Sequence, residues 1–145
     1  MPNSGGPPVV FIVDEDAAVR EALTRLMASA VLEAKPWPSP TEFLQQARSM
    51  RLACVLLDVM GVRACGADDR AALHSVAMVL PVIALSSSDD PAVRQLARAL
   101  GAEAFFRKPV DGPALLDTIE WVMQGDGHPI PGLAPRAGAP RKAWH

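Results

Sequence analysis

Residues 9–16 read VVFIVDED, a short apolar run that ends in three acids. The run is β-branched or aromatic and apolar at every position, which is typical of a strand buried on both faces of a parallel sheet. Two similar runs follow, ACVLL (53–57) and PVIAL (81–85), and a shorter one, AFF, spans 104–106. The sequence therefore predicts a sheet with these runs at its centre.

Helical patterns lie between the apolar runs. Apolar side chains recur at helical spacing over 19–30. Ser39 and Glu42 have the spacing of a capping box, which predicts the start of a second helix. The remaining helices are predicted at about 68–77, 90–101 and 115–123.

Two segments are less regular. VLEAK (31–35) predicts a weak edge strand, and 58–66, which contains Gly61 and Gly66, is expected to be irregular. Strands that alternate with helices indicate a parallel sheet covered on both faces, and right-handed crossovers restrict its topology. We therefore predict an α/β, doubly wound, flavodoxin-like fold with five parallel strands in the order 2-1-3-4-5.

The composition fits one globular domain. The chain has 145 residues, of which 50% are hydrophobic and 21% charged. No apolar run approaches the roughly 20 residues that span a bilayer, and a net charge of −2 argues against a nucleic-acid surface. Pro and Gly gather at both ends, so we predict a folded domain over 9–124 between a flexible N-terminus (1–8) and a flexible tail or interdomain linker (125–145).

Polar residues with related chemistry follow four of the strands. They are Asp14, Glu15 and Asp16 after the first, Asp58 after the third, Ser86, Ser87 and Ser88 after the fourth, and Arg107, Lys108 and Pro109 after the fifth. Because parallel strands end at one edge of the sheet, these residues are expected to lie together there. Carboxylates from neighbouring strands suit Mg²⁺, and a lysine beside a hydroxyl suits a phosphoryl group.

Each group also has an ordinary structural interpretation. Acidic loop residues are usually solvated, although a charge that directly follows a buried strand is costly unless it is paired. Ser88 is best explained by a turn or helix cap. For Lys108 the ordinary alternative is an exposed surface lysine. A helix-cap role for Asp58 is disfavoured because the next predicted helix begins too far along the chain. Taken together, the four groups favour one functional site over four coincidences.

These residues resemble the receiver domain of two-component response regulators. The resemblance covers about 9–123 and is carried by FIVDEDAAVREAL (11–23), SPTEFL (39–44), LLDV (56–59), PVIALS (81–86) and ALGAEAFFRKP (99–109). No single motif is specific, but their order and spacing are. The helical segments most resemble the receivers of regulators with a LuxR-type helix-turn-helix output.

The resemblance implies a role for each site residue. Asp58 would be the phosphoacceptor, taking a phosphoryl group from a sensor histidine kinase. Mg²⁺ would be held by Asp14, Glu15, Asp58 and the backbone carbonyl of Met60. The phosphoryl group would contact Ser86 and Lys108, with Phe105 as the aromatic switch residue, for which plain core packing is the alternative. Pro109, after a cis peptide bond, and Gly66 would be structural.

The resemblance also implies a cytoplasmic signalling protein that is not an enzyme. It would regulate transcription through an output domain or partner, without binding nucleic acid or a membrane itself. Its expected switch surface, and a possible homodimer interface, is the face of the fourth helix, fifth strand and fifth helix. That face would include Arg94, Arg98, Arg107 and Asp111.

The chain departs from the family in one loop. Val62 and Arg63 stand where the family usually has Pro and Gly, which affects the segment that carries the Met60 carbonyl. This departure supports an alternative, a pseudo-receiver interaction module that is not phosphorylated. A flavodoxin-like enzyme or cofactor binder is disfavoured, because acids rather than a Gly-rich phosphate loop follow the first strand.

Overall fold

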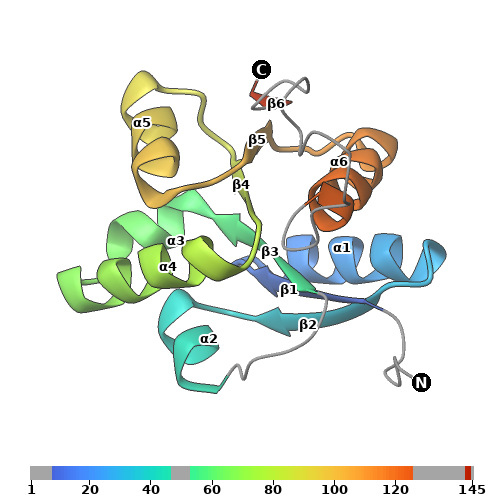
Figure 1. The fold of residues 1–145 in the computed structure, drawn as a ribbon, viewed down its shortest axis with the longest axis horizontal. Coiled ribbons are helices and arrows are strands. Elements are labelled where there is room, and N and C mark those ends of the chain that lie inside the picture. Colours follow the sequence, from blue (N-terminus) through green and yellow to red (C-terminus); the bar gives the residue numbers. More distant parts are fainter. Residues whose placement is uncertain (1–7, 47–52, 126–142, 145) are drawn as a thin grey trace.

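The computed structural model describes residues 8–46, 53–125 and 143–144, which form a parallel sheet between two layers of helices (Figure 1). The strands are β1 (Val9–Val13), β2 (Glu33–Trp37), β3 (Ala53–Asp58), β4 (Val82–Ser86), β5 (Ala104–Arg107) and β6 (Ala143–Trp144). The helices are α1 (Ala17–Ser29), α2 (Pro40–Gln46), α3 (Val59–Ala64), α4 (Ala67–Val79), α5 (Pro91–Leu100) and α6 (Gly112–Gly125). None of these helices combines the length and the apolar character that crossing a membrane requires.

The strand order is β2-β1-β3-β4-β5-β6, with every pair parallel. The predicted order 2-1-3-4-5 and the doubly wound fold are therefore confirmed. β6 was not predicted: it adds two residues at the edge of β5, opposite Ala104 and Phe105. It lies within the tail that we expected to be flexible, and residues 126–142 and 145 of that tail lie outside the described part.

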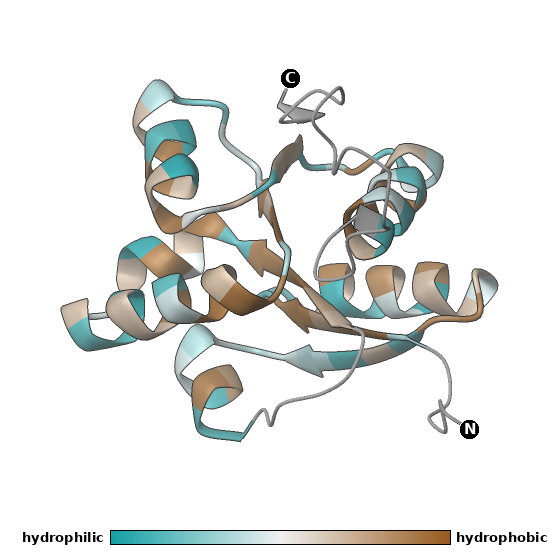
Figure 2. Ribbon diagram, viewed as in Figure 1, coloured by the Kyte–Doolittle hydropathy of each residue, from teal (hydrophilic) through white to brown (hydrophobic). Residues whose placement is uncertain are grey.

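Alternate residues of the strands pack on opposite faces of the sheet, as the two-residue period of a strand requires. Val10 and Ile12 of β1 belong to a core cluster shared with α1 and α6. Phe11 and Val13 belong to a second cluster shared with α2, α3, α4 and α5. Figure 2 shows the result: the central strands are hydrophobic, the edge strand β2 is more hydrophilic, and the helices carry hydrophilic residues on their surfaces.

The end of α1 explains why β2 begins two residues later than predicted. Val31 has a φ of 59°, its N–H donates to the Ala28 carbonyl, and the N–H of Leu32 donates to the Met27 carbonyl. This pair of bonds is a Schellman motif, in which the left-handed position is usually a glycine. Val31 therefore closes the helix, and β2 starts at Glu33.

The sequence predicts that the segment 58–66 is irregular. This prediction is wrong, because the segment contains the helix α3. Asp58 is its N-cap, with its Oδ1 3.4 Å from the amide nitrogen of Met60 that donates to it. The expectation that Asp58 caps no helix is therefore wrong. Val59 and Val62 are both buried, so the helix has an apolar face of two residues, which is too short to be recognised as a period in the sequence.

Val31 provides a test of the backbone. A β-branched residue with a positive φ is strained, and the Val31 side chain is 75% exposed, so its removal costs little packing. Val31→Gly should raise the free energy of unfolding by about 1 kcal/mol, after the greater freedom of glycine in the unfolded chain is allowed for. Urea unfolding measures this change. Val31→Ala is the control, because it keeps a Cβ and should gain less; an equal gain would mean that the positive φ is not the cause.

Candidate functional site at the carboxyl ends of the strands

The buried polar residues in the described part of the chain all lie at one edge of the sheet. They are Asp14, Asp58 and Ser86, which are 2%, 7% and 0% exposed. Asp14 directly follows β1, while Asp58 and Ser86 are the last residues of β3 and β4. The parallel register sets these strand ends side by side, so the edge predicted from the sequence exists.

Lys108 joins the carboxylates of this edge. Its Nζ lies 2.7 Å from Oδ2 of Asp14 and 3.5 Å from Oδ1 of Asp58. Its backbone N–H donates to the Ser86 carbonyl at 2.8 Å, which fixes the end of β5 against β4. The peptide bond from Lys108 to Pro109 is cis, as the resemblance implies. The lysine is thus a partner of two buried acids rather than an ordinary surface residue.

The acids after β1 have three different environments. The carboxylate of Asp14 accepts from the Asp16 N–H at 2.9 Å, while its carbonyl accepts from Arg20 Nη1 at 2.7 Å. Asp16 caps α1, accepting from the N–H groups of Ala18 and Val19. Glu15 is exposed. Arg20 was not identified from the sequence, although its place six residues after Asp14, in the first turns of a helix, puts it within reach.

The serines after β4 form a turn. Ser86 Oγ accepts from the Ser88 N–H at 2.9 Å, and Ser88 Oγ accepts from the Asp90 N–H at 3.1 Å. The turn role predicted for Ser88 is therefore confirmed. Ser86 differs from Ser88 because it is fully buried at the same edge as Asp14 and Asp58.

Phe105 lies inside the protein. It is 1% exposed and packs with Val59, Ala84 and Val93. The guanidinium carbon of Arg94 lies 4.7 Å from the centre of its ring, a cation–π distance, and Arg94 also pairs with Asp89 at 3.0 Å. The ring therefore occupies a core position beneath α5, and Arg94 covers it. The sequence analysis places Arg94 on the expected switch surface, but nothing in the sequence predicts its contact with the Phe105 ring.

Two further predicted residues lie around the site. Pro109 is exposed after Lys108. Gly66 is the N-cap of α4 with a φ of −80°, and a Cβ built on it would meet no atom within 4 Å. Nothing in this arrangement requires a glycine at position 66.

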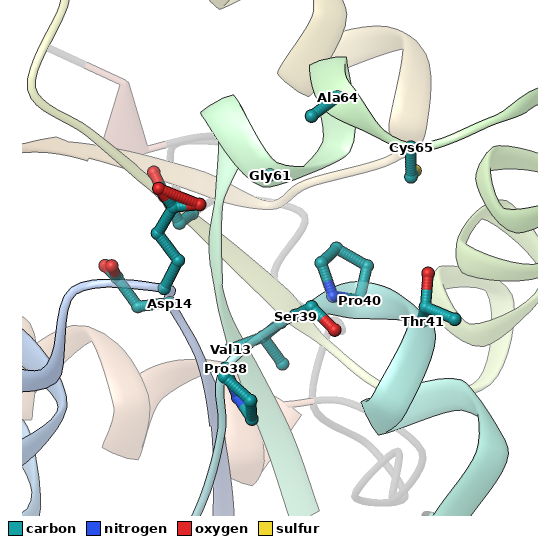
Figure 3. A pocket seen from close by; sticks show the side chains of 11 residues that line it. Val13, Asp14, Pro38, Ser39, Pro40, Thr41, Gly61, Ala64 and Cys65 are labelled. Atoms are coloured by element: carbon teal, nitrogen blue, oxygen red, sulfur yellow. The ribbon is translucent and has the colours of Figure 1, made fainter.

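A cavity of about 140 Å³ opens beside the carboxylates, lined by Asp14, Glu15 and Asp58. Figure 3 shows Asp14 on one side, the segment Pro38–Thr41 below it, and Gly61, Ala64 and Cys65 of the α3 region above. The cavity is large enough for several waters. It lies beside Asp58 and is lined by carboxylates rather than by Ser86 or Lys108.

The donor set fits Mg²⁺ in part. Mg²⁺ is usually bound through one or two carboxylates while it keeps several waters, and Asp14 and Asp58 already converge on one positive charge. Glu15 lines the adjoining cavity. Across the described segments, no three His, Cys, Asp or Glu side chains lie close enough together to hold a metal ion. Met60 lies in the first turn of α3, where its carbonyl is directed along the helix, so it does not fit as a ligand.

The electrostatics of Asp58 follow from its position. Burial raises the pKa of Asp58 above its ordinary value, Lys108 opposes this change, and the nearby Asp14 adds to it. The folded chain therefore binds this proton more tightly than the unfolded chain. The stability that the protonated carboxyl contributes is present at acid pH and is lost as the pH rises through the raised pKa.

Asp58→Asn should therefore raise the free energy of unfolding at pH 7. Asparagine keeps the cap of α3, and Lys108 keeps Asp14 as its partner. The gain should shrink as the pH falls toward about 4, because the wild-type carboxyl becomes protonated. Urea unfolding with a chelator present, repeated across this range, measures the difference. Asp117→Asn, on the exposed face of α6, is the control, and a pH-independent gain at Asp58 would contradict the prediction.

Comparison with known proteins agrees with this geometry. The family model of the response regulator receiver domain matches residues 10–120. The transcriptional regulatory protein TdiR of Thauera aromatica is 34% identical over 117 residues, which cover 81% of this chain and 52% of TdiR. The response regulator protein TodT of Pseudomonas putida is 32% identical over 135 residues, 92% of this chain and 56% of TodT. The chain spans about half the length of these relatives.

Solved structures show the same fold. A response regulator receiver protein from Burkholderia phymatum is 34% identical, with a TM-score of 0.65, over 85% of this chain and 99% of its own. The chemotaxis response regulator CheY4 of Vibrio cholerae, 24% identical with a TM-score of 0.67 over 80% and 98% of the two chains, shares the architecture. Such domains are signalling modules rather than enzymes, and they generally bind Mg²⁺ at the phosphorylation site. Since the family model covers most of the chain, the chain belongs to the response regulator receiver domain family.

Proposed function

We propose that this domain accepts a phosphoryl group on Asp58 from a sensor histidine kinase and passes the signal to a protein-interaction surface. The regulated process would be transcription, through an output domain or partner. The observation that carries the proposal is the ammonium of Lys108, which Asp14 and Asp58 share at the carboxyl edge of the sheet. This arrangement brings a nucleophile and a partner for phosphoryl oxygens together.

The proposed transfer balances without a further reactant. A carboxylate oxygen of Asp58 forms a bond to phosphorus, while the bond from phosphorus to the imidazole nitrogen breaks and leaves its electron pair on that nitrogen. Lys108 and the hydroxyl of Ser86 would bind the phosphoryl oxygens. Asp14 and Asp58 would hold Mg²⁺ together with several waters, with Glu15 in the lining of the adjoining cavity. The ion would supply positive charge to the same oxygens.

A pseudo-receiver remains the second candidate. The observation that favours it is α3, the helix that occupies the segment after Asp58 in place of a loop. The buried carboxylate of Asp58 and its lysine favour phosphorylation instead, since a module that only binds partners has no need of either. Phosphorylation by a small donor decides between the two.

Purified protein should take up one phosphoryl group from acetyl phosphate in the presence of Mg²⁺. Asp58→Asn should abolish the mass increase, and Lys108→Ala should lower the labelling rate by at least about tenfold. Intact-mass spectrometry measures both. Asp117→Asn is the control for the loss of an acid. Labelling of the Asp58 variant would reassign the phosphoacceptor, and no labelling of the folded wild type would favour the pseudo-receiver.

The surface that would read the signal is formed by α5, β5 and α6. These helices are the fourth and fifth of the sequence analysis, which did not include α3. A short route connects it to the site. Ser86 ends β4, and two residues earlier Ala84 pairs with Phe105, which Arg94 covers from α5. A phosphoryl group adds about two negative charges beside Ser86 and Lys108, so it would change the contacts of Ser86, the first residue of this connection.

Beryllofluoride, a mimic of the phosphoryl group, should therefore slow amide exchange around Ser86 and along the 90–120 face. Sedimentation should detect any accompanying dimer. The same additions to Asp58→Asn are the control and should change nothing. Exchange that changes only within 58–66 would show that Phe105 is a core residue without a switching role.

A further inference from the structure

We propose that α3 withdraws the Met60 carbonyl from the cation site, and that Arg70 is the positioning residue that holds α3 in place. The domain would then hold Mg²⁺ through side-chain carboxylates and water alone. This inference rests on the proposed function, because it concerns the same site. It makes Arg70 and the pair Val62 and Arg63 determinants of metal affinity.

The first step is the direction of the Met60 carbonyl. In an α-helix the carbonyl of each residue accepts from the N–H four residues later, which for Met60 is the N–H of Ala64. Both residues lie within α3. The carbonyl is therefore directed along the helix and has a partner there, while the Met60 N–H is donated to the Asp58 carboxylate. The peptide group of Met60 thus presents a donor to Asp58, and its acceptor is turned away.

The second step is what keeps so short a helix in place. Six residues do not form a stable helix by themselves, so contacts with the rest of the fold must hold it. Val62 is 1% exposed in the core cluster of α2 and α4. Gly61 packs so closely on Pro40 that an added Cβ would lie 3.3 Å from its ring. Figure 3 shows the Pro40 ring below Gly61 beside the cavity that both residues line.

Arg70, on α4, binds the last turn of α3. Its Nε donates to the Val62 carbonyl at 3.2 Å, and its Nη2 donates to the Arg63 carbonyl at 2.9 Å. The Val62 carbonyl also accepts from the N–H and the Sγ of Cys65, each at 3.2 Å. Carbonyls in the last turn of a helix lack the usual partner four residues later, so a guanidinium that binds two of them adds charge-assisted bonds to that end. Arg70 therefore fastens α3 to α4.

The sequence at 62 and 63 permits this arrangement. The N–H of Val62 is the first that can donate to the carbonyl of Asp58 within the helix. A proline at position 62 has no such N–H, and its ring would clash with the preceding turn. A glycine at 63 would further favour an open loop. Val62 and Arg63 are thus the residues that allow a helix where a Pro-Gly pair would prevent it.

The consequence is a site with one protein ligand fewer. Mg²⁺ demands a near-ideal octahedron, and each absent protein ligand must be replaced by a water. The carboxylates are in addition engaged with Lys108, so the cation competes with an ammonium. Restoring the carbonyl should raise the affinity for Mg²⁺ about tenfold, which is the usual scale for a change in the support of a metal site.

The test is a titration with magnesium chloride in which isothermal titration calorimetry measures the affinity for Mg²⁺. Val62→Pro combined with Arg63→Gly should bind Mg²⁺ about tenfold more tightly than the wild type, and Arg70→Gln severalfold more tightly. Arg25→Gln, on the exposed face of α1, loses the same charge without touching α3. It is the matched control and should bind as the wild type does. Unchanged affinity in a folded Arg70→Gln variant would overturn the proposal, even if the double variant fails to fold.

A second measurement examines the helix directly. In the wild type the Ala64 amide should exchange slowly and show a scalar coupling across its hydrogen bond to the Met60 carbonyl. Both signs should be lost in the double variant. An Ala64 amide that exchanges as freely as an exposed loop in the wild type would overturn the proposal. Labelling by acetyl phosphate is measured separately. If the variants change the Mg²⁺ affinity as expected but the wild type is not phosphorylated, only the proposed function is refuted. If the wild type is phosphorylated but the variants leave the Mg²⁺ affinity unchanged, only this inference is refuted.

Discussion

The ion pair between Lys108 and the two buried carboxylates is the constraint on which the site depends. Two acids at the end of adjacent strands would repel one another, and burying either one unpaired would be costly. The ammonium of Lys108, which follows β5, pairs with both and offsets part of this cost, although the pKa of Asp58 stays raised by burial. The register must therefore bring the ends of β1, β3, β4 and β5 level, and the apolar alternation of those strands specifies that register.

The surroundings of Asp58 differ on its two sides. Toward β4 and β5 it meets Lys108, whose Nζ is 3.5 Å from its Oδ1, and the strand that ends in the buried Ser86. Toward α2 and α4 it meets a helix fixed by Val62 and Arg70. The proposed signal would leave Asp58 on the side of β4, β5 and α5, where Ala84 pairs with Phe105 and Arg94 contacts the ring.

Most of this fold could be predicted from the sequence, because buried parallel strands are continuous apolar runs and because strand ends share an edge. The parts that could not be predicted depend on tertiary contacts. α3 has an apolar face of only two residues, and contacts with Pro40 of α2 and Arg70 of α4 hold it in place. β2 begins late because Val31 adopts a left-handed conformation that its side chain gives no reason to expect. β6 has two residues, fewer than any pattern can reveal, and the contact of Arg94 with Phe105 joins separate elements.

The composition of β2 has a consequence for association between molecules. An edge strand exposes unpaired backbone groups that can pair with another chain. β2 has the proline Pro36, which lacks an N–H, and the exposed charged residues Glu33 and Lys35, whose side chains pair at 3.2 Å. At the opposite edge β6 already pairs with part of β5. The β2 edge is therefore poorly suited to growth by strand addition, and β6 covers part of the β5 edge, so the domain can be held at high concentration with little tendency for its strands to aggregate.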